Sequence, residues 1–497
     1  MNDDYVGRVV RMAYLTFDIG TTALKTALIG EDGAVLALAD VEYTPRTPRP
    51  GWMEEEPQTY WQAAIAGSRA VLEGAGASGD SVSAIGLSSQ GESFVALDEA
   101  GRPLTPVIVW LDGRARGVAE RWQREGLTAE QFRAITGYPW IVHELTVFKI
   151  GWLAEHQPEA HRAAKFLCLP DYLVHRMTGE FATDYNIAQM GGLLDVGRGE
   201  WSQEMLNMAG ISAAQLPSIH TPGTPVGEVG AGAAEALGVT PGTLVCTGCN
   251  DQLAGAIGAG NVRPGVVSET TGTALAVVAT TADRVDSDQF FVGRHAAEGA
   301  WYSMPYAAVS AIVLTWFRDL VGANDWDDLL AGVNQVPPGA DGLTVLPHFS
   351  GTPDDPDARG AILGLTLGHG RAQIARAIME GCACLLRELL QPVIDHGLTM
   401  ESVRSLGGAA RSDAWLQMKA DMLQTPVERP ACTEAASLGA AMLAATGTGQ
   451  FDTLEDAADA WYRPAERFEP NPSLAEAYDD VFARYVDRCD ALYDGKE

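Results

Sequence analysis

The chain has 497 residues, of which 46% are hydrophobic and 20% charged, a composition typical of globular proteins. It is too long for a single hydrophobic core, so we expect at least two domains. The formal net charge of -31 argues against nucleic acid and anionic membranes as partners, because no excess of Lys or Arg is available to replace phosphate counterions. A small phosphate ligand is still compatible with this charge if backbone N–H groups and a metal ion help to bind it.

Strand-like and helix-like segments alternate along the chain, the order typical of an α/β protein. A buried strand is expected to end near Ile19, with a tight turn after it and a returning strand from Leu24 to Ile29. The next expected elements are a helix at 57–75, a strand at 84–90, a strand at 107–112 and a helix at 117–126.

The first turn is also the first candidate site. The motif DIGTTAL places Asp18 at the end of a strand, directly before a Gly-Thr-Thr turn. Small side chains, hydroxyl groups and free backbone N–H groups suit an anionic oxygen. An ordinary solvated hairpin with a capping aspartate explains the same residues equally well.

Two later stretches have the same strand-to-helix character. One strand is expected to end at Cys246, before Asp251 and a helix at 253–259. The aspartate is either a first-turn acid of that helix or a carboxylate at a strand's carboxyl end, where α/β proteins bind ligands. The other strand is expected to end at Leu406, before a glycine pair and a helix that starts at Ser412.

The motif DIGTTAL recurs loosely half a chain later as ETTGTAL, again followed by an apolar run. Two such hairpins suggest a duplicated α/β domain with a cleft between the two copies. The stretch AGNVRPGVV, whose glycines and proline interrupt the pattern, is the predicted boundary. We therefore expect an N-terminal domain at 1–260 and a C-terminal domain at 261–497.

Several common motifs are missing or misplaced. No P-loop sequence occurs, and GAGASG follows a helix and precedes a strand, the reverse of the dinucleotide-binding order. The seven cysteines include one C-x-x-C and no second pair, which fits reduced thiols in the cytoplasm. The first residues are too polar for a signal peptide, and no apolar run is long enough to span a bilayer. We expect a cytoplasmic protein.

Five motifs in order resemble the FGGY family of carbohydrate kinases. DIGTTALK resembles the family's first phosphate hairpin, ETTGTA the second, and LGGAARSDAWLQMKADMLQTPV its adenosine segment. The stretch 360–380 fits the C-terminal signature, and TVFKIGWLAEH, 146–156, fits the N-terminal one. Glu144 departs from the pattern, because a small or aromatic residue is usual there. The resemblance implies two duplicated domains with the ribonuclease H-like fold of actin, hexokinase and the heat-shock ATPases.

By resemblance, the chain transfers the γ-phosphoryl group of ATP to a sugar hydroxyl with the help of Mg²⁺. Asp251 matches the catalytic base, and Asp18 and Asp251 match the carboxylates near the metal ion. The positions that match the family's ATP-binding residues are Gly20, Thr21, Thr22, Lys25, Gly272, Thr273, Gly407, Gly408, Ala409 and Ser412. The positions that match its sugar-binding residues are Gln90, Glu92, Trp110, Asp112, Glu144 and Asp251.

The sugar-binding segment reads Gln-Gly-Glu at 90–92, where xylulose kinases usually have Gln-Met-His and glycerol kinases Gln-Arg-Glu. Gly91 leaves room for a longer substrate or for a side chain from elsewhere in the chain. Carboxylates accept hydrogen bonds from hydroxyls and repel other carboxylates, so Glu92, Glu144 and Asp112 together favour a neutral sugar over a sugar acid such as gluconate. A solvated loop carboxylate is an equally good interpretation of Glu144.

We expect a ketopentose such as D-xylulose as the substrate. The alternatives are another ketose or a polyol such as glycerol, erythritol or a pentitol. A catalytically inactive, nucleotide-gated sugar sensor is the alternative from another class, and the presence of Asp18, Asp251 and both hairpins argues against it. Dimers are common in the family, so a homodimer is compatible with the resemblance, although no interface can be located from the sequence.

Overall fold

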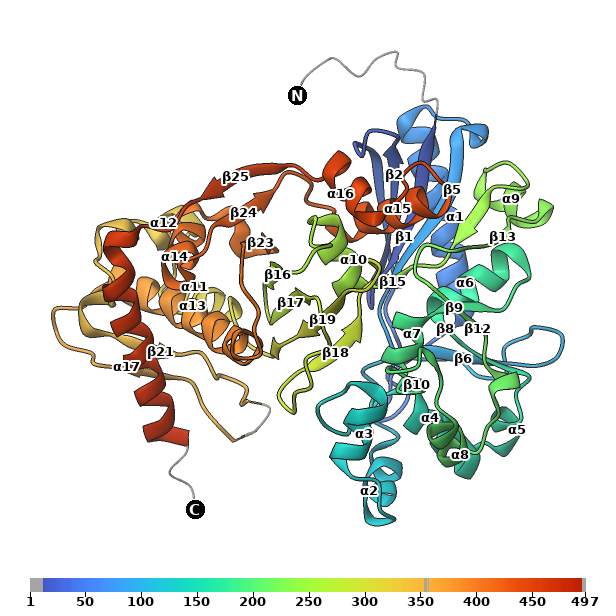
Figure 1. Ribbon diagram of the computed structural model, residues 1–497, viewed down its shortest axis with the longest axis horizontal. Coiled ribbons are helices and arrows are strands. Elements are labelled where there is room, and N and C mark those ends of the chain that lie inside the picture. Colours follow the sequence, from blue (N-terminus) through green and yellow to red (C-terminus); the bar gives the residue numbers. More distant parts are fainter. Residues whose placement is uncertain (1–11, 353–354, 356, 494–497) are drawn as a thin grey trace. The chain divides into compact units, whose positions relative to one another are not determined.

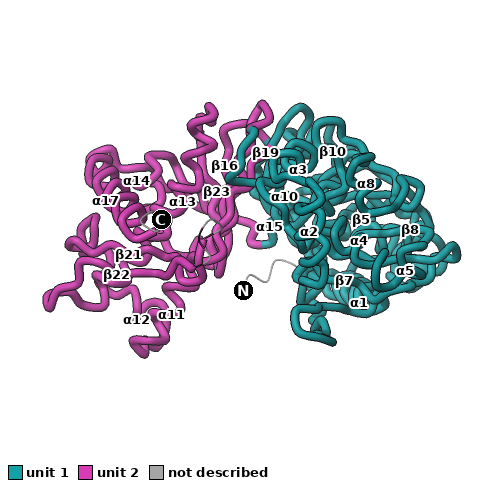
Figure 2. The backbone as a smooth tube through the Cα atoms, turned by 90° about the horizontal axis from the view of Figure 1, so that it is seen from below, with its two compact units in different colours: residues 1–262, 286–301, 434–462 teal, residues 263–285, 302–433, 463–497 magenta. Residues whose placement is uncertain are grey.

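The computed structural model describes residues 12–352, 355 and 357–493, which form two compact units (Figure 2). The first unit runs to Val262 and also contains 286–301 and 434–462, while the remaining segments form the second unit. The segments 286–301 and 434–462 therefore lie outside the unit that a single boundary at residue 260 assigns to them. The functional domains 1–260 and 261–497 stay a prediction. Residues 1–11, used above to argue against a signal peptide, lie outside the described part.

The main sheet of the first unit has the strand order β13-β14-β5-β1-β2-β3, and β15 pairs with β5 (Figure 1). Strands β1, β14 and β15 run parallel to β5, whereas β2 returns antiparallel to β1. The strands of this sheet are β1 (Ala13–Ile19), β2 (Ala23–Gly30), β3 (Val35–Glu42), β5 (Val82–Ser89), β13 (Pro225–Glu228), β14 (Leu244–Cys246) and β15 (Cys249–Asn250).

Helices and short strands complete the first unit. Strands β4, β7, β6 and β8 form a small sheet in that order, and β10 pairs with β11 and β9 with β12. The helices are α1 (Pro57–Ala75), α2 (Arg116–Arg124), α3 (Ala129–Thr136), α4 (Thr146–His156), α5 (Pro158–His161), α6 (Leu169–Thr178), α7 (Tyr185–Met190), α8 (Gln203–Ala209), α9 (Ala231–Leu237), α10 (Asp251–Gly258), α15 (Ala435–Gly447) and α16 (Leu454–Trp461). The remaining strands are β4 (Glu54–Glu55), β6 (Phe94–Leu97), β7 (Val107–Ile108), β8 (Lys165–Cys168), β9 (Ala182–Asp184), β10 (Leu194–Asp195), β11 (Glu200–Trp201), β12 (Ser218–His220) and β18 (Phe291–Arg294).

Helices cover both faces of the main sheet. A Cβ added to Gly67 of α1 would lie 2.1 Å from the Thr26 hydroxyl oxygen, and one added to Gly86 of β5 would lie 2.4 Å from a carbonyl oxygen of α15. Thr26 pairs with Phe17 of β1, and Gly86 pairs with Thr16. Because consecutive strand residues point to opposite faces, α1 and α15 pack on opposite sides of the sheet.

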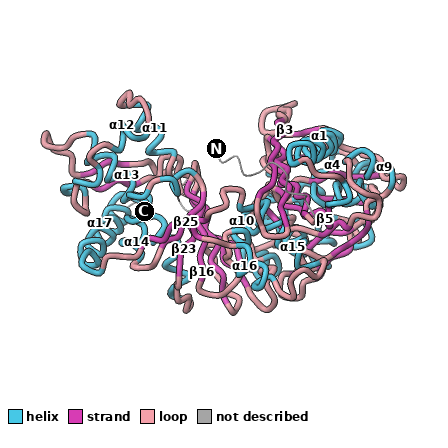
Figure 3. The backbone as a smooth tube through the Cα atoms, turned by 90° about the horizontal axis from the view of Figure 1, so that it is seen from above, coloured by secondary structure: helices cyan, strands magenta, loops and turns pink. Residues whose placement is uncertain are grey.

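The sheet of the second unit contains β19-β17-β16-β23-β24-β25 in that order, and β20 pairs with β17. Figure 3 labels three strands of this sheet, β16, its neighbour β23, and β25, which β24 separates from β23. Its strands are β16 (Val266–Thr271), β17 (Leu275–Thr281), β19 (Trp301–Met304), β20 (Tyr306–Ala307), β23 (Ser402–Leu406), β24 (Val427–Pro430) and β25 (Pro464–Phe468), and β21 (Thr344–Leu346) pairs separately with β22 (Ala361–Leu363). The helices are α11 (Ile312–Leu320), α12 (Trp326–Leu330), α13 (Arg371–Asp395), α14 (Asp413–Leu423) and α17 (Ala475–Tyr493).

Both predicted hairpins are present, and the α/β class is confirmed. Strands β1 and β2 form the first hairpin and β16 and β17 the second, and in each case the first strand also pairs in parallel with a later one, β5 or β23. The Gly20 N–H donates to the Ala23 carbonyl in the first turn, and the Gly272 N–H donates to the Ala274 carbonyl in the second. The second turn is therefore one residue shorter, which is why the sequence repeat is loose.

The predicted helix at 57–75 is confirmed, but the predicted strand at 107–112 is wrong beyond Ile108. The Asp112 N–H donates to the Val109 carbonyl and closes a turn there. The Lys149 ammonium donates to the carbonyls of Val109 and Trp110, which a strand would use for pairing. Among the described residues, no helix combines the length and the apolar character that crossing a membrane requires.

Helices α10 and α15 approach each other closely through glycines. A Cβ added to Gly439 of α15 would lie 1.9 Å from the Ala254 carbonyl oxygen of α10, and one added to Gly258 would lie 1.9 Å from the Ala435 carbonyl oxygen of α15. Each helix therefore needs a residue without a side chain at the crossing. This packing fixes the position of α10, whose first residue is Asp251.

We expect Gly439→Ala to lower the free energy of unfolding by about 1–3 kcal/mol, because the added methyl group forces the two helices apart. The control is Gly232→Ala in α9, where an added Cβ meets no atom within 4 Å. This control should leave stability unchanged or raise it by roughly 0.5–1 kcal/mol, since alanine is the better helix former. Urea denaturation measures both effects, and equal stability of the two variants would contradict the close crossing.

Candidate active site

Asp18 lies at the carboxyl end of β1, in register with Ser88 of the parallel strand β5. The Ser88 hydroxyl donates to Asp18 Oδ1 at 2.7 Å. The pKa of Asp18 is raised by burial, and the Ser88 hydrogen bond and the charge of Lys25 oppose this shift. The carboxylate keeps partial access to solvent. Asp18 is therefore a mostly desolvated acid that can still reach a ligand.

Asp251 lies at the same edge of the sheet. In β15, which pairs with β5, Asn250 follows Cys249 and also caps α10, because its side chain accepts from the Leu253 N–H at 3.0 Å. Asp251 is thus the first residue of the helix, which starts two residues before the predicted 253–259. The pKa of Asp251 is raised to about 7 by desolvation and then by the negative charge of Asp18. The charge of Asp18 thus opposes the ionisation of Asp251, and these two acids form the centre of the candidate site.

The two carboxylates fit a divalent cation. A cation near Asp18 and Asp251 would offset the desolvation that raises the pKa of both acids and the charge of Asp18 that raises the pKa of Asp251 further. Across the described residues, no cluster of three or more His, Cys, Asp or Glu side chains is placed to hold a metal ion. The donor set therefore fits Mg²⁺, which binds one or two carboxylates and completes its coordination with water and substrate phosphates.

The first hairpin turn is held in place by three side chains. The Gln90 amide donates to the Gly20 carbonyl at 2.9 Å, and the Tyr43 hydroxyl donates to the same oxygen at 2.6 Å. The Trp110 indole N–H donates to the Thr21 hydroxyl at 2.8 Å. Gln90 and Trp110, predicted as sugar ligands, thus contact the predicted phosphate turn directly. Thr22 is exposed beside them.

Lys25 lies opposite Asp18 in the hairpin and pairs with the Glu434 carboxylate at 2.5 Å. The ammonium group is therefore already engaged within the first unit. Its predicted contact with ATP stays a prediction, and such a contact requires the lysine to share or leave this ion pair.

Glu92 has a strained backbone and a carboxyl group close to the centre of the site. Its φ of 57° lies in the left-handed region that non-glycine residues rarely adopt. The Thr146 hydroxyl donates to its carbonyl at 2.9 Å, and the Tyr138 hydroxyl donates to its carboxylate at 3.1 Å. Desolvation raises the pKa of Glu92, Lys149 and Tyr138 oppose the shift, and the charge of Asp251 adds to it. Such strain and desolvation are typical of functional sites.

The space beside Gly91 is filled by another side chain. A Cβ added to Gly91 would lie 3.0 Å from Met190 Cβ and 3.3 Å from its Cγ. Of the two possibilities left open by the sequence, a longer substrate or a side chain from elsewhere, the structure therefore shows the second at this position.

Asp112 is buried in an ion-pair network that was not foreseen. Both of its oxygens accept hydrogen bonds from Arg114, at 2.7 Å each, and one also accepts from the Met53 N–H at 2.6 Å. Arg114 also bonds to Glu54 and lies over the Trp52 ring. The acceptor capacity of Asp112 is thus largely used within the protein. Its role as a sugar ligand stays a prediction.

Lys149 was not identified from the sequence. It lies on α4, and it is fully buried and donates to the Val109 and Trp110 carbonyls at 2.9 and 3.1 Å. Desolvation lowers the pKa of this ammonium, and the charges of Asp112 and Glu92 oppose that shift. The signal for it was a single lysine inside the apolar run TVFKIGWL. Its positive charge and that of Arg114 offset part of the acidity on which the preference for neutral sugars was based.

Glu144 is partly exposed and pairs with His143 Nδ1 at 3.1 Å. Its charge also acts on Glu92 and Lys149, so it lies in their neighbourhood. This placement is compatible with both earlier interpretations, a loop carboxylate and a residue near the sugar. Its sugar contact stays a prediction.

The second unit contains a pocket of about 640 Å³ that gathers most of the remaining predicted residues. The five predicted ATP ligands that line it are Gly272, Thr273, Gly408, Ala409 and Ser412. Trp326 and Ile312 supply an apolar wall. Gly407, also predicted as an ATP ligand, is not among the lining residues; its φ is 79°, and a Cβ there would lie 3.0 Å from the Thr271 carbonyl oxygen. Only glycine therefore allows the loops after β16 and β23 to approach this closely.

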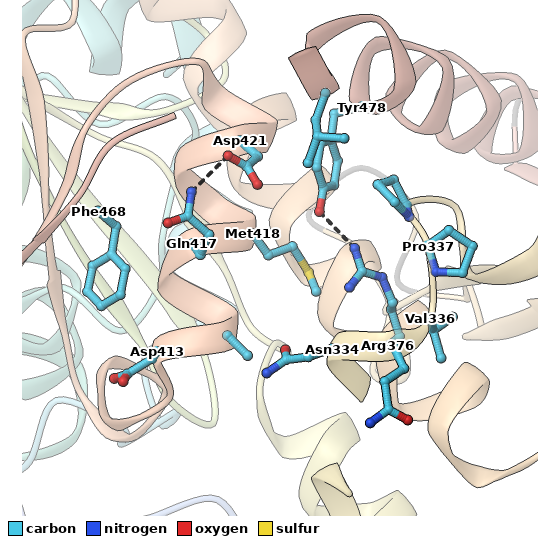
Figure 4. A pocket seen from close by; sticks show the side chains of 14 residues that line it. Asn334, Val336, Pro337, Arg376, Asp413, Gln417, Met418, Asp421, Phe468 and Tyr478 are labelled. Carbon is cyan, nitrogen blue, oxygen red and sulfur yellow. Dashed lines mark hydrogen bonds between the residues drawn. The ribbon is translucent and has the colours of Figure 1, made fainter. Parts of the chain in front are cut away.

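Another pocket of the second unit, of about 520 Å³, also borders α14 (Figure 4). Gln417, Asp421 and Met418 line it from that helix, and Arg376 and Tyr478 lie across from them, joined by a hydrogen bond of 2.9 Å. No predicted site residue lines this pocket.

The comparisons with known proteins decide the family. The N-terminal domain model of the FGGY family of carbohydrate kinases matches residues 13–258, and the C-terminal domain model matches residues 267–448. A xylulose kinase of Bacillus subtilis is 31% identical over 94% of this chain and 95% of its own length. The chain belongs to the FGGY family of carbohydrate kinases.

Further relatives agree with this assignment. A glycerol kinase of Methylibium petroleiphilum is 31% identical over 92% of this FGGY kinase and 95% of its own length. The crystal structure of xylulose kinase from Rhodospirillum rubrum superposes with a TM-score of 0.91 at 30% identity and covers 97% of this chain and 99% of that one. The predicted family, the two-domain actin-like fold and the class of ATP-dependent sugar kinases are confirmed.

We expect Asp251→Asn to stabilise this FGGY kinase at neutral pH. The folded-state pKa of Asp251 is about 7, against an ordinary value of 3.8, so between these values the folded protein holds a proton that the unfolded chain has released. The free energy of unfolding of the wild type should therefore fall as the pH rises from 4 to 7 and then level off. The variant has no carboxyl group at this position and does not lose stability in this way. Its free energy of unfolding should therefore exceed that of the wild type by roughly 1–3 kcal/mol above pH 7.

Urea denaturation between pH 5 and 8, with EDTA and without nucleotide, measures the difference. The control is Asp452→Asn, because Asp452 is exposed. The free energy of unfolding of this variant, plotted against pH, should run parallel to that of the wild type. A constant difference between Asp251→Asn and the wild type across this range would contradict the raised pKa.

Proposed function

We propose that this kinase phosphorylates a small neutral ketose, with D-xylulose as the leading substrate. The observation that carries the proposal is the pair of desolvated acids at the carboxyl edge of β1 and β15, of which Asp251 has a pKa raised to about 7. The similarity to xylulose kinases over nearly the whole chain supports the choice of sugar.

In the proposed reaction, Asp251 accepts the proton of a sugar hydroxyl while that oxygen attacks the γ-phosphorus of ATP and ADP departs. Burial and the charge of Asp18 raise the pKa of Asp251 to about 7 when no metal ion is bound, which makes its carboxylate a better proton acceptor than a solvated one. Its place at the first turn of α10 keeps it rigid, since α10 is packed against α15 through glycines. Phosphoryl transfer requires mainly such positioning and charge compensation.

Asp18 and Asp251 are the residues that would hold Mg²⁺. The metal ion, when bound, supplies positive charge to the terminal phosphates of the nucleotide. The Gly20–Thr22 turn follows Asp18 directly in the chain, and its shape is fixed by Gln90, Tyr43 and Trp110. We assign this turn to the terminal phosphates and the 640 Å³ pocket of the second unit to the adenosine end of ATP.

Sugar recognition is assigned to Glu92, Trp110 and Asp251 first, and to Glu144 and Asp112 as more distant contributors. The Glu92 carboxylate accepts from Tyr138 and retains capacity for a sugar hydroxyl. With Lys149 and Arg114 compensating part of the charge, the preference for a neutral sugar rests on Glu92 and Asp251. A polyol is the second candidate, because the glutamate at position 92 matches the Gln-Arg-Glu of glycerol kinases and glycerol kinases are 31% identical relatives.

The proposal also includes a cytoplasmic location and a homodimer. ATP as co-substrate and seven free cysteines support the location. The mass of the purified protein in solution, measured by light scattering, tests the dimer.

The substrate proposal is tested by ADP release from Mg-ATP with D-xylulose, other ketoses, glycerol, erythritol, pentitols and gluconate. We expect the highest kcat/KM with a ketopentose and no turnover of gluconate. Asp251→Asn should reduce kcat by about 10²- to 10⁴-fold with the best sugar, since the general base is lost. Turnover of gluconate alone contradicts the neutral sugar, and an unchanged kcat of the variant removes Asp251 from the mechanism.

A bulky side chain in the pocket of the second unit should weaken ATP binding. An added Cβ at Gly408 meets no atom within 4 Å, so Gly408→Leu fills empty pocket space without disturbing the fold. We expect the KM for ATP to rise at least roughly tenfold, which corresponds to about 1.4 kcal/mol of lost binding. The KM for the sugar should stay unchanged.

The control for this substitution is Gly117→Leu, at an exposed glycine of α2 that also has free space around it. It should leave both constants at the wild-type values. If Gly408→Leu behaves like this control in steady-state kinetics, the adenosine end of ATP does not lie in this pocket.

A further inference from the structure

A closed network of buried polar groups lies beneath the pocket of the second unit. The Lys419 ammonium of α14 donates to Glu269 Oε1 at 2.6 Å, to Thr271 Oγ1 at 2.9 Å and to Ser405 Oγ at 3.3 Å. The Thr271 hydroxyl donates to Glu269 Oε2 at 2.5 Å, and the Ser405 hydroxyl donates to Glu269 Oε1. All three donors of the ammonium and both oxygens of the carboxylate are therefore used.

The network is inaccessible to solvent. The Lys419 side chain is 1% exposed and the Glu269 side chain 0%. A buried ion pair gains little net stability over apolar residues, because both charges lose their hydration. Its presence here calls for a reason other than stability.

The network joins the two strands that lead into the nucleotide pocket. Glu269 and Thr271 lie on β16, and Ser405 lies on β23 in register with Glu269. The next residues along the two strands include the pocket residues Gly272 and Gly408. Lys419 is thus bonded to the base of both loops at once.

Thr271 connects the network to the pocket directly, because it also lines the cavity. Its carbonyl oxygen is the atom that leaves space only for a glycine at position 407. Trp415, one turn before Lys419 on α14, lines the same pocket, and the Lys419 ammonium lies 5.7 Å from its ring centroid. Gln417 and Asp421 of the same helix line the other pocket, which Figure 4 shows.

We propose that Lys419 is a positioning residue for the nucleotide, which holds the loops after β16 and β23 at a fixed separation through Thr271, Ser405 and Glu269. This inference rests on the proposed function, in which that pocket binds the adenosine end of ATP. The lysine acts through hydrogen bonds to other residues and does not itself contact the ligand.

Three variants separate positioning from stability. Lys419→Met leaves the Glu269 carboxylate buried and unpaired. The double variant Lys419→Leu with Glu269→Leu removes both charges and all their hydrogen bonds but keeps the space filled. The double variant Lys419→Gln with Glu269→Gln removes the charges and keeps side chains that bond to each other and to the two hydroxyls.

We measure the melting temperature, the Kd for ADP by calorimetry, and the KM values for ATP and sugar. Lys419→Met should lower the melting temperature and raise the Kd for ADP and the KM for ATP at least roughly tenfold. The double Leu variant should have the melting temperature of the wild type but not its affinity for ADP. The double Gln variant should have both. The KM for the sugar should stay within about twofold in all three, because the sugar residues belong to the first unit.

Arg376→Met is the matched control, because it breaks another buried ion pair of the second unit, Arg376–Glu380 at 2.9 Å, away from the nucleotide pocket. It should lower the melting temperature without changing the Kd for ADP. The inference is overturned if Lys419→Met binds ADP like the wild type, or if the double Leu variant has full nucleotide affinity. If the wild-type protein itself binds no ADP, the proposed function is wrong. If the wild type binds ADP and Lys419→Met binds it equally well, only the role of Lys419 is wrong, so the two failures are distinguishable.

Discussion

The repulsion between two carboxyl groups that have lost most of their hydration is the constraint on which the rest of the first unit depends. Asp18 and Asp251 lie at the ends of strands on either side of β5, and burial raises the pKa of both. Apolar packing around two buried acids does not compensate for the hydration that they lose. It persists because the residues around it are held by interactions that do not involve either acid, such as the Asn250 cap of α10 and the glycine crossing with α15.

The two units hold their hairpins in place with different kinds of interaction. In the first, the hairpin turn is held by neutral donors from Gln90, Tyr43 and Trp110, which converge on Gly20 and Thr21. In the second, charged groups hold the equivalent strand, through a lysine and a glutamate that are sealed from solvent. In both units these side chains bond to carbonyl, carboxylate or hydroxyl oxygens and not to the backbone N–H groups of the turns.

Much of this could be predicted from the sequence, because the decisive features are local. A strand, a tight turn and a helix are encoded within about 20 residues, and in an α/β sheet the carboxyl ends of parallel strands meet at one edge. Asp18, Asp251 and the glycine loop at 407–408 were found in this way. The strand at 107–112 was wrong because Lys149, some 40 positions away, takes the carbonyls that a strand needs.

What escaped prediction depends on partners that are distant in the chain. Lys25 and Glu434 are separated by 409 positions, and Lys419 and Glu269 by 150. No local sequence pattern relates such residues. A lysine in an apolar helical stretch looks in the sequence like any other polar residue that interrupts the stretch. Arg114 was missed for a different reason, because its partner Asp112, only two positions away, was interpreted as a ligand of the sugar.

The contact between Gly91 and Met190 has a consequence for how this enzyme could diversify. The volume beside the Gln-Gly-Glu segment belongs to an unbranched thioether side chain from α7, which adapts its shape more easily than a branched or aromatic one. In the proposed sugar site, residue 190 would therefore set the space beside Gly91 without any change to the strained backbone at Glu92.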